Sequence, residues 1–131
     1  MGYALHVQAA SQATLVDAQT LYWGSMLVVP STTADRWRVY IPKSGIIKAA
    51  YIFNYAATAG TGESWSMSIR KNNATDTLIQ ALGVAANARC WSNVALNIPV
   101  VAGDYIEIKE VCPTWVTNPV TATRTGVIYI E

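Results

Sequence analysis

Apolar and polar residues alternate with a period of two along much of this 131-residue chain. The alternation is clearest in residues 63–82, where the apolar side chains of WSMSI are separated by serines. Such spacing gives a β-strand one apolar face and one polar face. Asn72 and Asn73 follow, and asparagine tolerates the positive φ angles of a tight turn. The stretch therefore predicts a β-hairpin of an antiparallel sheet.

The same pattern recurs from residue 20 to the end of the chain, in segments bounded by Gly, Pro, Asn or Asp. The expected strands are residues 20–30, 36–42, 46–57, 64–70, 76–82, 90–100, 105–111 and 126–131. About eight strands without a convincing helix between them favour an all-β, antiparallel jelly-roll β-sandwich over a βαβ fold. No internal repeat is present, which disfavours a solenoid or a propeller.

Residues 1–19 differ from the rest because they are rich in Ala and Gln and carry one charge, Asp17. Their apolar residues fit a helical stripe only weakly, and no strong cap is present. We expect residues 1–19 to form an arm, either helical or extended, that lies on the domain or on a partner. We expect residues 20–131 to form one jelly-roll domain, as the chain length suggests.

Two segments, residues 46–57 and 126–130, are apolar on both faces. Strands of a two-layer sandwich expose one face, and no helix is expected to cover it. A second copy of the chain is the simplest cover, since closed homo-oligomers commonly bury such patches. The alternative is that these rings fill a large core. The expected subunit-interface residues are Tyr51, Phe53, Tyr55, Val127 and Tyr129.

Composition agrees with a protein that hides part of its exterior in an assembly. Charged residues make up 13% of the chain, against about 25% in a typical domain. A rigid secreted or viral β-module would have the same composition. The net charge of +1 and the lack of Lys/Arg clusters argue against a nucleic-acid partner. No apolar run is long enough to span a membrane, and no signal peptide is evident.

The cysteines Cys90 and Cys112 lie on different expected strands, and the sequence leaves open whether they pair. Burial as small hydrophobic residues is the more common state of such cysteines. The presence of one histidine, His6, and the lack of a CxxC motif argue against a zinc site. We expect no metal and no cofactor.

Catalytic patterns are also missing from the sequence. The acidic residues fall mostly at turns and strand edges, and Glu107 and Glu110 have an odd separation that directs them to opposite faces of a strand. Neither GxSxG nor a glycine-rich phosphate loop occurs. We expect a protein that is not an enzyme; a glycosidase pair from distant loops is the least favoured alternative.

One loop has the composition of a ligand site. Residues 113–119 place Trp115 between prolines, with Asn118 close by. A flat ring with amide donors suits a sugar, and Trp91 is a second candidate platform. The same loop would also suit docking on a neighbouring subunit, and we favour this interpretation.

Five segments together resemble a known group of proteins. They are VYIP (39–42), SGIIKAAYIF (44–53), WSMSIRKNNATDTLI (65–79), AGDYIEIK (102–109) and GVIYIE (126–131). Their succession resembles phage and phage-derived virion proteins whose C1q/TNF-like jelly rolls associate as homotrimers. The resemblance covers about residues 20–131. It implies that Asn72, Asn73, Gly103 and Asp104 act as turn formers, and that aromatic and aliphatic side chains of one sheet form the trimer contact.

The function implied by this resemblance is structural. We expect a homotrimeric capsid decoration (cement) protein on the outer surface of a phage particle, bound to the major capsid protein and stabilising the head shell. The arm would contact the capsid through Leu5, Val7, Leu15 and Val16. The alternative is the receptor-binding or glycan-binding tip of a head or tail fibre, with a cell-surface glycan as its partner.

Overall fold

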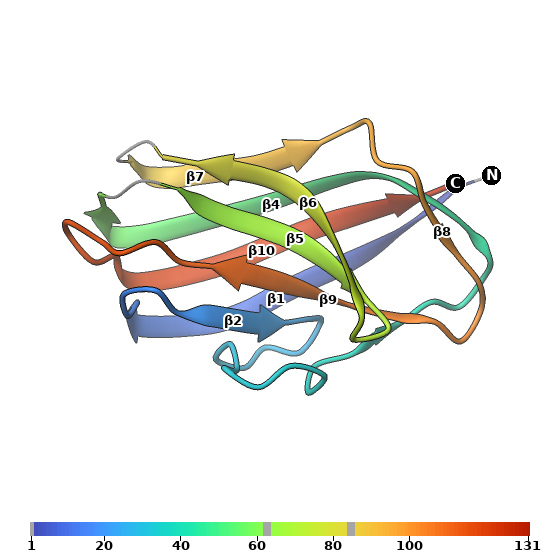
Figure 1. Ribbon diagram of the computed structural model, residues 1–131, viewed down its shortest axis with the longest axis horizontal. Coiled ribbons are helices and arrows are strands. Elements are labelled where there is room, and N and C mark those ends of the chain that lie inside the picture. The colour runs from blue at the N-terminus through green and yellow to red at the C-terminus, as the bar shows by residue number, and fades with distance from the viewer. Residues whose placement is uncertain (1, 62–63, 84–85) are drawn as a thin grey trace.

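The computed structural model describes residues 2–61, 64–83 and 86–131, which form two antiparallel β-sheets packed face to face (Figure 1). In chain order the strands are β1 (Tyr3–Thr14), β2 (Thr20–Trp23), β3 (Val39–Tyr40), β4 (Gly45–Gly60), β5 (Trp65–Lys71), β6 (Thr75–Leu82), β7 (Ala86–Asn93), β8 (Ile98–Val100), β9 (Tyr105–Val111) and β10 (Val120–Ile130). None of the described residues lies in a helix, and hence none forms a helix that could span a membrane. The all-β antiparallel jelly roll expected from the alternation is confirmed.

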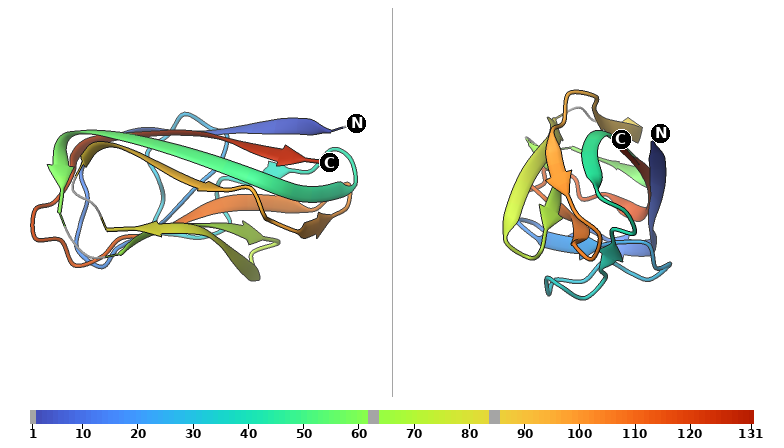
Figure 2. Two further views of the ribbon diagram at one scale, coloured as in Figure 1. Left: turned by 90° about the horizontal axis from the view of Figure 1, so that it is seen from above. Right: turned by 90° about the vertical axis from the view of Figure 1, so that its right-hand side faces the viewer.

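The two sheets differ in which strands they contain. Sheet A has the order β1-β10-β4-β7, with β8 also paired to β4. Sheet B has the order β2-β9-β5-β6, with β3 also paired to β9. Figure 2 shows the two layers from above, with the termini close together at one end. The loops that follow β1 and β9 lie at the opposite end (Figure 1).

The turns form at the positions expected from the sequence. β5 and β6 pair as a hairpin, and Asn72 and Asn73 between them both have φ of 52°. The Asn72 side chain also donates to Asp104 Oδ1 (3.0 Å) and accepts from the Tyr105 backbone N–H (3.0 Å). Gly103 has φ of 94° in the turn before β9, where a side chain would be strained. These residues are turn formers, as expected.

Most of the expected arm is instead a strand of the sandwich, which corrects the expected domain boundary. Residues 3–14 are strand β1, which pairs with β10 from Tyr3–Ile130 to Thr14–Val120. This segment alternates too, but its inward residues Val7 and Ala9 are small and its outward ones are polar or small. Because the alternation is weak, it does not predict a strand here. The partner of this strand, β10, lies more than 100 residues away in the chain.

Several other boundaries also differ from expectation. Only Val39–Tyr40 of the segment 36–42 pairs as a strand, because the residues before it form a loop over sheet B that is held by Glu107. The segment 90–100 is divided between β7 and β8. The last strand begins earlier than the expected 126–131, since β10 runs from Val120 to Ile130.

A group of tryptophans fills the core between the sheets. The Trp65 ring is met edge-on by Trp91 and by Trp115, with centroids 4.8 and 5.0 Å away and interplanar angles of 78° and 88°. Edge-to-face packing of this kind adds about 0.5–1.5 kcal/mol per pair to the burial of the rings. The rings therefore set the spacing of the sheets at this end of the molecule.

A buried ion pair crosses the core beside these rings. The side chains of Glu110 (β9) and Arg124 (β10) are both 0% exposed, and Arg124 Nε lies 2.7 Å from Glu110 Oε1. Arg124 Nη2 donates to Oε2 at 2.9 Å, so the contact is bidentate. The indole N–H groups of Trp23 and Trp65 donate to the two carboxylate oxygens at 3.2 and 3.1 Å. The carboxylate is thus fully hydrogen-bonded, which a buried charge requires.

Removing one partner of this pair should destabilise the protein strongly. We expect Glu110→Gln to lower the free energy of unfolding by about 3–5 kcal/mol, because Arg124 would remain buried without its counter-charge. Urea unfolding followed by tryptophan fluorescence measures the change. The double variant Glu110→Met/Arg124→Met should be more stable than Glu110→Gln, and Glu131→Gln, which alters an exposed carboxylate, should match the wild type. A loss below about 1 kcal/mol for Glu110→Gln would contradict this interpretation.

A second carboxylate predicts acid sensitivity. Asp76 accepts from Arg70 Nη1 and Lys109 Nζ, each at 2.7 Å. Partial burial raises the pKa of Asp76, but the hydrogen bonds from Lys109 and Arg70 outweigh it and hold the pKa below its usual value. The pKa of Asp76 is therefore lower in the folded state than in the unfolded state, where it is about 3.9. Ionised Asp76 stabilises the protein when the pH is above the unfolded-state pKa. This stability is lost as the pH falls through the folded-state pKa.

Asp76→Asn should therefore be less stable than the wild type at pH 7, by about 1 kcal/mol or less because the network is partly exposed. The difference should shrink as the pH falls below about 4 and disappear once the pH is well below the folded-state pKa of Asp76. Thermal unfolding of both proteins across this range measures it. A difference between them that does not change with pH would show that the charge of Asp76 is irrelevant.

Candidate functional site

The candidate site is the outer face of sheet A, which carries a row of exposed aromatic and aliphatic side chains. Tyr51, Phe53 and Tyr55 of β4 are 46%, 42% and 49% exposed, and Val127 and Tyr129 of β10 are 38% and 39% exposed. All five residues expected at a subunit interface therefore lie outside the core. The alternative, that these rings fill a large core, is wrong.

The strand register explains how these side chains form one surface. Val127 lies opposite Tyr51, and Tyr129 lies opposite Ala49. Thr125 and Thr123 occupy the intervening positions, opposite Phe53 and Tyr55. Directly paired residues on one face of an antiparallel sheet are about 4.5–5.5 Å apart, so the side chains are in contact range across the two strands.

The flanking strands extend this surface without adding charge. β1 places Ala4 and His6 opposite Tyr129 and Val127, and β7 places Cys90 opposite Phe53. The His6 ring lies on the same face, where its Nε2 is 2.9 Å from Thr125 Oγ1. The outward side chains that the register pairs in this central region include no Asp, Glu, Lys or Arg. Such a face has the composition of an interface core, which is depleted in charge and enriched in aromatic residues.

The edge of sheet A next to this face is covered in the middle of β1. The chain after β2 runs along β1, where the Gln8 and Ala10 N–H groups donate to the carbonyl oxygens of Gly24 (2.8 Å) and Val28 (2.9 Å). Covered edges of this kind prevent another chain from adding a strand there. The face is therefore the larger surface that is available for association on this side of the sheet.

The expected ligand platform is not confirmed. Trp115 is 6% exposed and Trp91 is 0% exposed, because both rings pack on Trp65 inside the core. The Asn118 side chain donates to the Leu15 carbonyl (2.6 Å) and to Asp17 Oδ1 (3.1 Å), so it fastens the chain after β1. These three residues are structural, and the interpretation of them as a sugar site was wrong.

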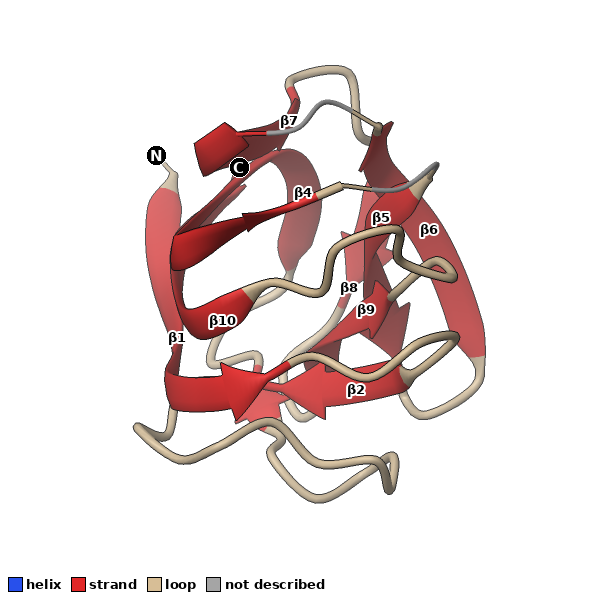
Figure 3. Cartoon of the chain, turned by 90° about the vertical axis from the view of Figure 1, so that its left-hand side faces the viewer, coloured by secondary structure: helices blue, strands red, loops and turns tan. Residues whose placement is uncertain are grey.

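The residues expected to contact a capsid from the arm are mostly unavailable. Val7 and Leu15 are 1% and 0% exposed, and Leu5 is partly buried against the core. Leu5 and Val7 face the core from β1, and Leu15 follows β1, where its backbone N–H donates to the Pro119 carbonyl (3.1 Å). Val16 is 57% exposed and follows β1, whose last residue is Thr14. Figure 3 views the molecule from the end where β1 finishes.

The titratable groups are placed mainly for structure. Glu107 and Glu110 point to opposite faces of β9 as expected: Glu107 accepts from the backbone N–H of Asp35 (2.7 Å), whereas Glu110 lies in the core. Cys90 is exposed and Cys112 is buried, and both are free. Burial and the neighbouring Glu110 raise the pKa of the Cys112 thiol. Among the described residues, no three His, Cys, Asp or Glu side chains are grouped to hold a metal.

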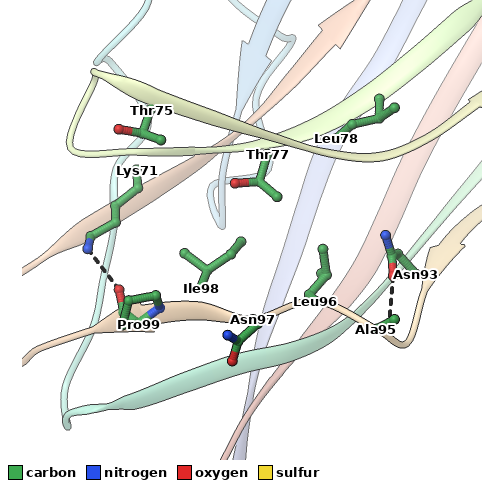
Figure 4. A pocket seen from close by; sticks show the side chains of 10 residues that line it. All are labelled: Lys71, Thr75, Thr77, Leu78, Asn93, Ala95, Leu96, Asn97, Ile98 and Pro99. Carbon is green, nitrogen blue, oxygen red and sulfur yellow. Dashed lines mark hydrogen bonds between the residues drawn. The ribbon is translucent and has the colours of Figure 1, made fainter.

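A groove of about 450 Å³ lies between the β5–β6 hairpin and the chain from β7 to β8 (Figure 4). Its most prominent cation, Lys71, is already engaged, because Nζ donates to the Pro99 carbonyl at 2.8 Å and lies 3.6 Å from Asp104 Oδ2. Asn93 Oδ1 likewise accepts from the Ala95 N–H. The lysine and one of the two asparagines that line the groove are therefore engaged within the chain.

Comparison with known proteins identifies the fold. No protein-family model matches this chain, and no curated protein sequence does. The structure of Eiger TNF from S. frugiperda is similar with a TM-score of 0.54 and 12% identity, over 99% of this chain and 93% of that chain. A chain in the structure of infectious bursal disease virus, Gx strain, aligns over all of this chain and 32% of its own length, with 11% identity and a TM-score of 0.39. The first likeness shows a TNF-like jelly roll, and the second is too distant to add to it.

Proposed function

We propose that this protein is a non-enzymatic structural protein that assembles as a homotrimer through the outer face of sheet A. The observation that carries the proposal is the row of exposed rings on β4 and β10, within a surface that has no charged side chain at its centre. Burying apolar area gives about 25 cal/mol per Å², and the aromatic side chains are the largest contributors. We infer that the assembly has three copies because residues 20–131 resemble jelly rolls that form trimers.

The same resemblance suggests where the trimer acts. We propose a capsid decoration (cement) protein on the outside of a phage head, bound to the major capsid protein. The contact with the shell is assigned to the end of the sandwich opposite the termini. Val16 and Val116 are exposed there, at 57% and 85%, and the hydrogen bond from the Trp115 N–H to Asp17 Oδ1 holds their two segments side by side. A fibre tip that binds glycan gains no support, since its expected platform is buried.

The first test concerns assembly. We expect the wild type to have three times the 14.2 kDa chain mass by light scattering at micromolar concentration. Phe53→Asp should give a folded monomer or aggregates, because an unpaired charge in the interface costs several kcal/mol. Val101→Asp is the matched control, since it places the same charge at an exposed valine outside the face. A wild-type mass of one chain would refute the assembly.

The second test concerns the shell. Val16→Ser/Val116→Ser should remain a trimer but lose most of its binding to heads of the phage that encodes it, as measured by co-sedimentation. Leu27→Ser, at another exposed apolar position, is the control. If the double variant binds the heads as well as the wild type does, this end of the sandwich is not the contact.

A further inference from the structure

A row of three polar side chains lies inside the sandwich on sheet A. Arg124 of β10 is paired with Asn54 of β4, and Asn54 is paired with Arg89 of β7. The three residues are 3%, 1% and 6% exposed. Neighbouring strands are about 4.8 Å apart, so the row spans only about 10 Å. Two guanidinium groups thus flank one amide in the core.

The charges of this region do not balance among the described residues. Glu110 neutralises Arg124 with both carboxylate oxygens, which also accept from the two indole N–H groups. Arg89 donates to the Gly60 carbonyl at 2.6 Å and lies 4.9 Å from the centre of the Trp65 ring, but no described carboxylate forms an ion pair with it. Burial lowers the pKa of Arg89, although arginine keeps its charge in proteins. Among the residues that the structure describes, Arg89 therefore has no counter-charge.

The hydrogen-bonding groups show the same imbalance. Four donors at this end of the core have no acceptor within hydrogen-bond distance among the described residues. They are Asn54 Nδ2, Arg89 Nε, Trp115 Nε1 and Arg124 Nη1. Arg89 and Trp115 both contact the Trp65 ring, and the strand register places Asn54 between Arg89 and Arg124. The four residues that carry these donors are therefore neighbours in the core. An unsatisfied buried donor costs about 1–3 kcal/mol, and more when the group is charged.

The type of group that would satisfy this set is determined by its chemistry. All four atoms are donors, so the partner must supply acceptors, and it must also carry negative charge to offset Arg89. A water molecule would accept hydrogen bonds but would bring two donors of its own and leave the charge uncompensated. A small anion meets both requirements, and the close packing of the tryptophans favours a single-atom ion over a larger oxyanion.

We propose that Arg89, Asn54, Trp115 and Arg124 form an internal binding site for one monovalent halide ion, chloride under physiological conditions. The ion would lie between the sheets and act as the counter-charge of Arg89. It would stabilise the folded chain and have no part in the subunit contact on the opposite face of sheet A. The proposal is therefore independent of the proposed function.

The test is thermal unfolding at constant ionic strength, with sodium gluconate replaced stepwise by sodium chloride. We expect the melting temperature to rise by about 3 °C or more as chloride increases from about 1 to about 300 mM, because a ligand that binds only the folded state stabilises it. Bromide should act in the same way. A melting temperature that does not depend on halide would overturn the proposal and leave water as the partner of these donors.

Two variants separate the internal site from surface effects. Arg89→Met should lose the dependence on chloride, whereas Arg38→Met, which removes the same charge from the surface, should keep it. A dependence that persists in Arg89→Met would refute the site. Should Arg89→Met fail to fold, wild-type crystals grown in bromide decide the question. An anomalous peak within hydrogen-bond reach of Arg89 Nε and Asn54 Nδ2 is expected, and its absence at full halide concentration would overturn the proposal.

Discussion

The contact between Glu110 and Arg124 is the constraint on which the rest of this structure depends. It joins the middle strands of the two sheets, β9 and β10, across the core, and the indole groups of Trp23 and Trp65 hold the carboxylate from the side of sheet B. A buried pair adds little net stability over an apolar core, but breaking it is costly. The sheets can therefore stack only in an arrangement that keeps the pair together.

In this arrangement, the inner face of sheet A carries a row of polar residues and its outer face carries apolar ones. The inner face contains Arg124, Asn54 and Arg89, whereas the outer face carries tyrosine, phenylalanine and valine. Because side chains alternate along a strand, fixing the polar residues inside forces the aromatic residues outside. A sheet face of this composition, beside an edge that the chain itself covers, is suited to contact with further copies of the molecule.

Local signals in the sequence were sufficient for the hairpin of β5 and β6 and for the turns at Asn72, Asn73 and Gly103, since these depend on neighbouring residues. They also indicated that β4 is apolar on both faces. Strand β1 was missed because alanine and glutamine alternate weakly, and because its pairing with β10 depends on residues at the far end of the chain. Trp115 was misplaced for a similar reason: proline and threonine neighbours resemble an exposed loop, whereas the ring packs on Trp65.

The sequence by itself determined the class of fold and the positions of the hairpin and turns. It also showed that some strands carry apolar residues on both faces, more than one core can hold. Alternation, turn chemistry and composition are properties of short segments, and they survive in any packing of the strands. Only the tertiary structure decided that Tyr51, Phe53 and Tyr55 face outward while Asn54, Arg89 and Arg124 face inward. That choice depends on the counter-charge and hydrogen-bond donors that the facing sheet supplies, and these come from strands distant in sequence.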